Sequence, residues 1–146
     1  GLREYQVPVE YGRSEIIRKG KKIAVLGVGS MIPSCMEICK GLKDDGYDPT
    51  FVNARFVKPL DVDLLDELAK DHSLFVTVEE NVKSGGYGEH VSAYMEACHP
   101  EIRVLSAAVW DRFVPQGNVE SLRSRIGLGV EDIRQAIEDS EELREQ

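Results

Sequence analysis

An apolar run that ends in two carboxylates constrains this chain more than any other segment. Residues 74–78 (LFVTV) are apolar or β-branched without alternation, which is typical of a strand buried on both faces of a parallel sheet. Glu79, Glu80 and Asn81 follow directly, and a glycine-rich turn leads into the next helical pattern. Open α/β sheets carry functional loops at the carboxyl ends of their strands, so we expect a site here.

Strands and helices alternate along most of the chain. Apolar runs predict strands at residues 22–27, 50–53, 74–78 and 102–106, with helical patterns between them. Parallel strands need long, right-handed crossover connections, so the alternation predicts a three-layer αβα domain with a mainly parallel five-stranded sheet. A segment at about residues 14–18 is the candidate fifth strand, placed at an edge in the antiparallel sense.

The helices are defined by their termini and apolar faces. Ser30 is a candidate cap for a helix that runs to about residue 45, and Asp61 for a helix from about residue 62 to 71. Further helices are expected near residues 88–97, 119–125 and 130–137. The apolar face of the first helix is expected to consist of four side chains: Ile32, Met36, Cys39 and Leu42.

Length and composition bound the class of protein. A chain of 146 residues suits one domain, which we divide into a linker (1–13), a folded domain (14–139) and an acidic tail (140–146) that frays. The net charge of −8 provides no basic stripe, so neither nucleic acid nor a membrane is an expected partner. Because the chain starts at Gly1 with polar, irregular sequence, we expect it to be a piece of a longer protein.

The cysteines and histidines do not predict a catalytic or metal site. An odd count of three cysteines favours a reducing cytoplasm over a disulfide framework. Cys35 and Cys39 lie one helical turn apart in a spacing that matches no zinc module, so we expect core thiols. His72 and His90 have no Ser or Cys partner that the sequence places beside them, so nucleophilic catalysis is not predicted.

The turn at residues 27–30 (GVGS) follows a strand and opens a helix, which is the context in which a helix N-terminus binds phosphate. A dinucleotide fingerprint would need a glycine where Ile32 stands, and the lysine of a P-loop is absent. We interpret the segment as a tight turn with a serine cap. The alternative is a small-anion site at Gly29, Ser30 and the glycine turn within residues 85–88.

The adjacent carboxylates Glu79 and Glu80 point to opposite sides of a strand end, so a catalytic pair is not expected. A cap or an interface salt bridge is favoured over an acid with a raised pKa in a cleft. Arg55 can bind an anion, or pair with Asp61 or a neighbouring domain. Trp110 and Phe113 form a candidate patch for a partner domain.

Several of these segments together resemble a known family. VNARFVKPLD (52–61), VTVEENVKSGGYG (76–88) and DRFVPQG (111–117) are similar to the carboxyl-terminal domain of 1-deoxy-D-xylulose-5-phosphate synthases, within the transketolase carboxyl-terminal family. IAVLGVGS (23–30) and IGLGVEDIRQAI (126–137) agree in position and type. The resemblance covers roughly residues 14–138 and so implies the same fold for nearly the whole chain.

The resemblance also implies an activity for the parent protein. Members condense pyruvate with glyceraldehyde 3-phosphate to 1-deoxy-D-xylulose 5-phosphate and carbon dioxide, for isoprenoid, thiamine and pyridoxal phosphate synthesis. They are homodimers of three-domain chains that use thiamine diphosphate and magnesium, and the first two domains carry the cofactor. The diphosphate motif GDG is absent here, and its nearest counterpart is residues 44–46 (DDG) at a helix end. No catalytic, cofactor-binding or metal residue is therefore assigned.

Three interpretations remain open at this point. The chain is a non-catalytic domain that packs on its parent's N-terminal cofactor domains, a free-standing domain that binds a small anion, or the corresponding domain of another transketolase or 2-oxoacid dehydrogenase-like enzyme. In the first case the isolated chain is inactive. The candidates for a domain interface or active-site rim are Arg55, Glu79, Glu80, Asn81, Gly85, Gly86, Trp110 and Phe113.

Overall fold

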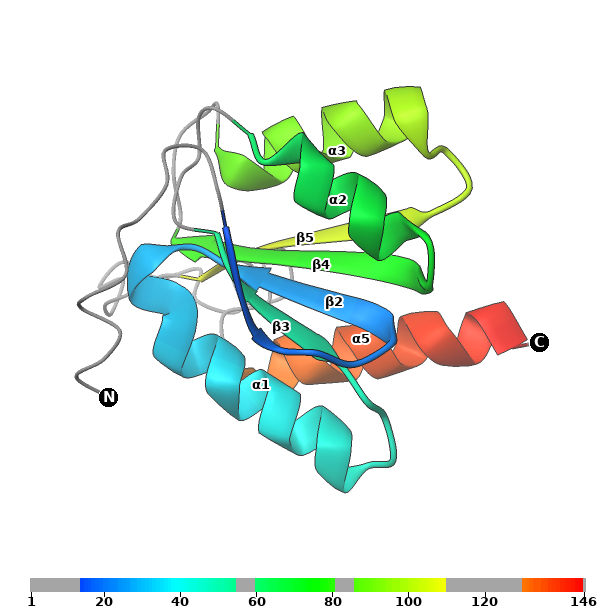
Figure 1. Cartoon of the computed structure of the whole chain (residues 1–146). Coiled ribbons are helices and arrows are strands. Elements are labelled where there is room, and N and C mark those ends of the chain that lie inside the picture. The colour runs from blue at the N-terminus through cyan, green and yellow to red at the C-terminus, as the bar shows by residue number, and fades with distance from the viewer. Residues whose placement is uncertain (1–13, 55–59, 81–85, 110–129, 146) are drawn as a thin grey trace, which may run out of the picture.

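A five-stranded sheet between two layers of helices forms the domain (Figure 1). The computed structural model describes residues 14–54, 60–80, 86–109 and 130–145. The strands are β1 (Glu15–Arg18), β2 (Lys22–Gly27), β3 (Thr50–Asn53), β4 (His72–Glu80) and β5 (Arg103–Val109). The helices are α1 (Ile32–Asp44), α2 (Val62–Ala69), α3 (Tyr87–Cys98) and α5 (Val130–Glu145).

The strand order is β1-β3-β2-β4-β5, and every neighbouring pair is parallel except β1 with β3. In the register, Val25 of β2 lies between Phe51 of β3 and Val76 of β4. The predicted three-layer fold with a mainly parallel sheet is therefore confirmed, and so is the antiparallel edge strand near residues 14–18.

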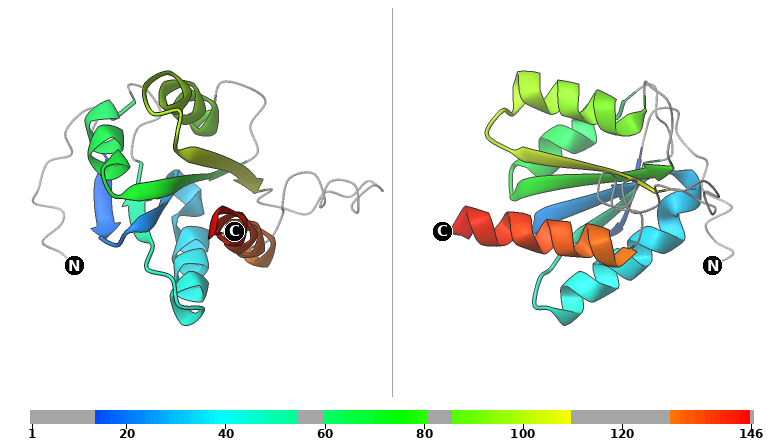
Figure 2. Two further views of the ribbon diagram at one scale, coloured as in Figure 1. Left: turned by 90° about the vertical axis from the view of Figure 1, so that its right-hand side faces the viewer. Right: turned by 180° about the vertical axis from the view of Figure 1, so that it is seen from behind.

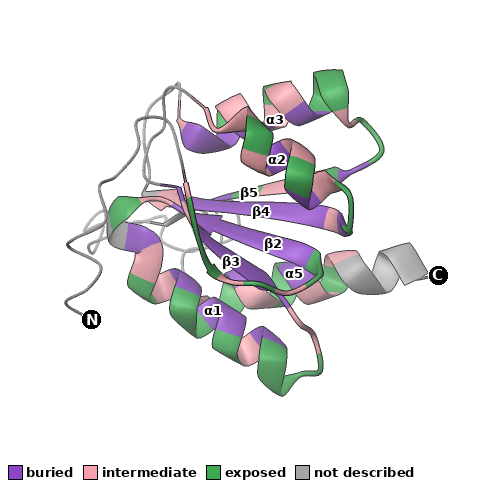
Figure 3. Ribbon diagram, viewed as in Figure 1, coloured by how far each residue is buried: buried purple, intermediate pink, exposed green. Residues whose placement is uncertain are grey.

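Helices α1 and α5 cover one face of the sheet, and α2 and α3 cover the other (Figure 2). Successive side chains of a strand point to opposite faces, so Val76 packs with α1 and α5 whereas Phe75 packs with α2 and α3. Both faces of β2 and β4 are consequently buried (Figure 3). This double burial explains why residues 74–78 are apolar or β-branched without alternation.

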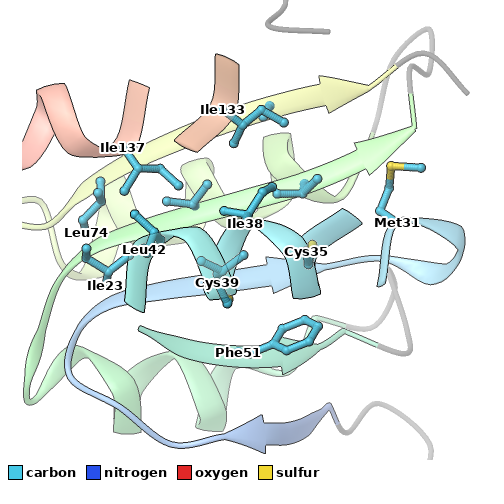
Figure 4. Close-up of a cluster of buried hydrophobic side chains, with 14 residues drawn as sticks. Ile23, Met31, Cys35, Ile38, Cys39, Leu42, Phe51, Leu74, Ile133 and Ile137 are labelled. Carbon is cyan, nitrogen blue, oxygen red and sulfur yellow. The ribbon is translucent and has the colours of Figure 1, made fainter. Parts of the chain in front are cut away.

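The core on the α1 side joins segments from both ends of the sequence (Figure 4). Ile133 and Ile137 of α5 are buried against the same cluster as Ile23 of β2. Arg134 of α5 binds the carboxylate of Asp45 at the end of α1, and this ion pair joins the two helices. Its guanidinium also binds Glu131 and Glu138 within α5. Gly41 lets the two helices approach, since a Cβ there would meet Cδ of Arg134 at 2.5 Å.

The expected apolar face of α1 is wrong at one position. Met36 is 58% exposed, while Cys35 and Ile38 are fully buried. A helix turns about 100° per residue, so the buried stripe at 35, 38, 39 and 42 leaves position 36 on the outer side. The cap also differs from expectation: Ser30 lies in a 3₁₀ turn (Gly29–Met31), and Met31 occupies the N-cap position of α1.

The C-terminal end of α5 was predicted wrongly. α5 was expected to end near Ile137 before a frayed tail, but it continues to Glu145. Residues 138–145 (EDSEELRE) are mostly strong helix formers, and an i,i+4 bond from Gln135 Nε2 to Asp139 Oδ1 (3.0 Å) extends the exposed face. The helix expected at 119–125 lies outside the described residues. The division into linker, domain and tail stays a prediction.

Candidate functional site at the carboxyl end of the sheet

The four parallel strands all end on one side of the domain, which we call the carboxyl end (Figure 1). β2 stops at Gly27, β3 at Asn53, β4 at Glu80 and β5 at Val109. Helices α1, α2 and α3 each begin on this side, because each follows a strand and runs back along the sheet. The positive ends of three helix dipoles therefore face the same region, in which α/β folds bind ligands and partners.

Glu79 closes the start of α3. Its Oε1 accepts the backbone N–H of Tyr87 (2.9 Å), and its Oε2 accepts the backbone N–H of Gly88 (2.8 Å). These donors belong to the first helical turn, where N–H groups have no partner within the helix. The carboxylate also places negative charge at the positive end of the dipole. The interpretation of Glu79 as a cap is confirmed.

Gly88 allows this close arrangement. A Cβ at position 88 would lie 2.8 Å from Glu79 Oε2, 2.8 Å from Thr77 Oγ1 and 3.0 Å from Ser106 Oγ. Only glycine lets the first turn of α3 sit this close to both β4 and β5. Thr77 Oγ1 is buried there and has no hydrogen-bond partner within the part of the chain that the structure describes.

Asp61 caps the N-terminus of α2. Its Oδ1 accepts the N–H of Leu64 (3.2 Å), which confirms the predicted cap. Its Oδ2 accepts the N–H of Ser14 (2.7 Å), so the same carboxylate fixes the chain where it enters β1. The phenol of Tyr87 is buried, and burial raises its pKa; the negative charges of Asp61 and Glu79 raise that pKa further.

The start of α1 is different. No side-chain cap is found for it among the described residues, although Pro33 occupies the first turn as expected. Gly29 has φ +52, in the left-handed region, and a Cβ there would meet nothing within 4 Å. Of the three helix N-termini, those of α2 and α3 are filled by protein carboxylates. The glycine turn before α3 is therefore an unfavourable anion site, whereas the start of α1 remains a candidate.

The structure places only some of the predicted site residues. Glu79 and Gly86 come together, since Gly86 is the N-cap residue of the helix that Glu79 caps. Glu80 continues the ladder opposite Val109. The remaining candidates lie outside the described residues: Arg55, Asn81, Gly85, Trp110 and Phe113.

Sequence reasoning missed Tyr87 and Gly88 as the partners of Glu79. A cap normally comes from the residue just before the helix, but this one comes from the preceding strand, eight residues before Tyr87. The only signal in the sequence was a carboxylate at a strand end followed by glycines.

The described residues offer no catalytic constellation. Both oxygens of Glu79 are held by backbone N–H groups, which leaves the carboxylate poorly placed for proton transfer. No group of three His, Cys, Asp or Glu side chains in the described ranges could hold a metal ion.

Burial raises the pKa of Cys35 and of Cys39 to about 12, as expected of core thiols, while Cys98 is exposed. None of the described helices has the length and apolar character needed to span a bilayer.

The opposite side of the sheet, which we call the amino end, holds a buried polar network. Thr50 at the start of β3 and His72 at the start of β4 are joined by a 2.7 Å hydrogen bond between Oγ1 and Nε2. Thr50 Oγ1 also accepts the N–H of Gly20 (2.8 Å), and His72 Nδ1 bonds the carbonyl of Leu68 (2.8 Å) and Asp71 Oδ1 (2.6 Å). The buried polar atoms of Thr50 and His72 are thus satisfied within the domain.

The strand order and the two helix layers define a three-layer αβα domain with a mainly parallel sheet. Residues 12–133 match the family described as transketolase, C-terminal domain. The chain belongs to the transketolase C-terminal domain family.

The comparisons also identify more specific relatives. The chain is 39% identical to the 1-deoxy-D-xylulose-5-phosphate synthase of Lachnoclostridium phytofermentans over 134 residues, 91% of this chain and 21% of that protein. It is equally similar to the synthase of Dictyoglomus thermophilum, at 39% over 94% of this chain and 22% of that protein. It therefore spans about a fifth of the length of these curated relatives. Among solved structures, the chain superposes on a split gene transketolase with a TM-score of 0.75 and 29% identity, over 92% of this chain and 44% of that one. That structure is described as an inactive beta4 tetramer, a name for the assembly that has no relation to strand β4.

Proposed function

We propose that this chain is the C-terminal assembly domain of a thiamine-diphosphate-dependent 1-deoxy-D-xylulose-5-phosphate synthase. The observation that carries the proposal is the coverage: the chain matches such synthases over nine-tenths of its own length and a fifth of theirs. The parent would convert pyruvate and glyceraldehyde 3-phosphate to 1-deoxy-D-xylulose 5-phosphate and carbon dioxide in the cytoplasm. The domain would contribute contacts to that enzyme and no reacting group.

The described residues do not fit a site for thiamine diphosphate and magnesium. The carboxylates of Asp61 and Glu79 bind backbone N–H groups, and no acidic or histidine cluster for a cation occurs within the described ranges. We therefore assign both groups to the N-terminal domains of the parent chain, as the family resemblance implies.

The carboxyl end of the sheet is the proposed contact surface with those N-terminal domains. Helix starts and strand ends converge there, and the rim candidates Glu80 and Gly86 lie there. In the full-length protein we propose a homodimer, in which this surface supports the cofactor domains. The description of a related split gene transketolase as an inactive β4 tetramer is in keeping with a part that folds and associates without activity.

One observation favours a second function. The start of α1 has no side-chain cap among the described residues, beside the open turn at Gly29, and this is the arrangement in which a small anion binds. Titration with inorganic phosphate, followed by thermal stability and calorimetry, would separate a free-standing anion-binding domain from an assembly domain. The corresponding domain of another transketolase or of a 2-oxoacid dehydrogenase-like enzyme is the third alternative, and the natural reading frame would identify it.

The central test is turnover with and without the rest of the parent. We expect the pure chain to be folded by circular dichroism and to release no carbon dioxide from pyruvate with thiamine diphosphate and magnesium. The full-length parent should be active, and deletion of residues 14–145 should abolish its activity or its assembly. Turnover by the pure chain would falsify the assembly role.

A further inference from the structure

Among the described residues, the side chain of Glu79 joins the end of β4 to the start of α3. The backbone leaves β4 at Glu80 and enters α3 through Gly86. Glu79, next to the end of the strand, reaches across to the first two helical residues through two hydrogen bonds of 2.9 and 2.8 Å. Its carboxylate thereby joins the two ends of the connection directly, independently of the residues between them.

The geometry of this contact restricts rotation as well as distance. A single hydrogen bond would leave the first turn of α3 free to rotate about that bond, whereas two bonds to consecutive N–H groups restrict this rotation. Gly88 also lies against Thr77 of β4 and Ser106 of β5, at separations that leave no room for a Cβ. The first turn of α3 is therefore held against both strands at the carboxyl end.

We propose that Glu79 is a positioning residue that sets the spacing and orientation of the β4–α3 junction, and through it the surface that meets the cofactor domains. This inference rests on the proposed function, because it requires the carboxyl end to be the contact surface. Glu79 acts through the backbone of Tyr87 and Gly88, whose N–H groups occupy both of its carboxylate oxygens. Its effect on the enzyme is accordingly expected in binding more than in chemistry.

Three substitutions of Glu79 remove its two hydrogen bonds to different extents. Glu79→Gln keeps one carbonyl oxygen and loses the charge, so it can accept one of the two bonds. Glu79→Asp keeps the charge but is shorter by one methylene, about 1.5 Å, and cannot reach both N–H groups. Glu79→Ala removes both acceptors and leaves a space at the helix start into which formate can bind.

Asp66 provides a matched control. Its Oδ1 also accepts two hydrogen bonds from the α3 region, from Tyr94 Oη (2.7 Å) and His99 Nε2 (2.8 Å). These partners lie towards the far end of α3, away from the carboxyl end. Asp66→Asn therefore disturbs the attachment of the same helix without touching the junction.

The experiment uses the full-length parent enzyme and compares kcat, the KM for pyruvate and amide hydrogen exchange at positions 87 and 88. We expect Glu79→Ala to raise KM about 3- to 10-fold, to lower kcat less than 3-fold and to speed exchange at both amides. Glu79→Gln should show a smaller rise, and Asp66→Asn should leave KM within 2-fold. Sodium formate, with sodium chloride as the control, should lower the KM of Glu79→Ala towards wild type and leave Glu79→Gln unchanged.

Three outcomes would overturn the inference. They are an unchanged KM in Glu79→Ala despite faster exchange, an equal KM change in Asp66→Asn, and a fall in turnover by about two orders of magnitude or more with KM unchanged, which is the loss expected when a group that acts in proton transfer is removed. If Glu79→Ala does not fold, Glu79→Gln decides by the same criteria. Failure of the proposed function would look different, since the parent without residues 14–145 would then still assemble and turn over at the wild-type rate.

Discussion

The two ends of the sheet are stabilised by different means. At the amino end, Thr50 and His72 are 0% and 4% exposed, and they bond to each other and to the backbone of Gly20 and Leu68. At the carboxyl end, Asp61 and Glu79 are only partly buried; each caps the start of a helix, and Asp61 also binds the N–H of Ser14. The amino end is thus complete within the domain, whereas the carboxyl end has polar groups close to the surface that a partner can reach.

This difference predicts that substitutions at the two ends of the sheet affect different properties. Unsatisfied polar atoms cost most where water cannot replace the lost bond, so damage at the amino end should appear as lost stability. Damage at the carboxyl end should cost less stability, because water can reach half-buried groups, and should appear in assembly with the parent. Substitutions at different depths in the sheet can test that prediction, and their expected effects decrease from the centre of the sheet to the surface.

The largest effect is expected midway between the two ends. Val76→Asp places a carboxylate on the fully buried strand β4, between β2 and β5, where no cation is available in the α1-side core cluster. An unpaired buried charge costs several kcal/mol, about 3–5 in measured cases, so the whole domain, with both ends of the sheet, should unfold. Circular dichroism and a thermal scan provide the measurement. A melting temperature equal to wild type would contradict the central position of β4.

An intermediate effect is expected from Thr50→Val at the amino end. The substitution preserves shape but leaves His72 Nε2 and the N–H of Gly20 without their partner, at a cost of about 1–3 kcal/mol in the free energy of unfolding. Urea unfolding measures it. Thr77→Val is the matched control, because Thr77 is equally buried and its Oγ1 has no partner among the described residues. Since this substitution breaks no hydrogen bond of the described residues and removes an unsatisfied hydroxyl, we expect stability to stay the same or to rise. Equal losses in the two variants would remove the contrast between the ends.

The smallest effect concerns Asp66 on the surface between α2 and α3, and it depends on pH. Hydrogen bonds from His99 and from Tyr94 lower the pKa of Asp66 below its ordinary value of 3.8. A carboxyl whose folded pKa is depressed contributes stability above its unfolded pKa, and that contribution is lost as the pH falls through the folded pKa. Wild type should therefore melt slightly above Asp66→Asn at pH 7, and the difference in melting temperature should shrink as the pH falls through the lowered pKa of Asp66. A difference in melting temperature that grows on acidification would contradict the expected sign.

Much of the fold was predictable because its signals are local. The run at residues 74–78 is apolar or β-branched because the strand is covered by helices on both sides, and the edge segment near residues 14–18 is short and has charged residues beside its two isoleucines. Met36 was wrongly assigned to the buried face of α1. An apolar face that is assigned one residue out of register still contains mostly apolar residues, so the sequence pattern did not reveal the error. The end of α5 was misjudged because an acidic composition is equally compatible with a helix and a frayed tail.

The candidate site was less predictable, because its contacts join residues that are far apart in the sequence. The sequence indicated that a functional loop follows β4, yet it left Glu79 open as a cap, an interface group or an acid. The tertiary structure decided this by bringing the first turn of α3 within reach. The network of Thr50 and His72 was missed for the same reason, since 22 residues separate the two side chains. The roles of Arg55, Trp110 and Phe113 stay predictions.

The position of α5 has a consequence for the newly made chain. Of the buried core residues in the described part of the chain, those on the α2 and α3 side of the sheet have all been synthesised once Ile102 is made, but the α1 side still lacks Ile133 and Ile137. A ribosome makes the chain from the amino end, so one face of the sheet stays partly uncovered until the last helix emerges. Translation that stops before residue 133 would release a domain with an open apolar face, which is the type of surface that chaperones bind and that aggregates.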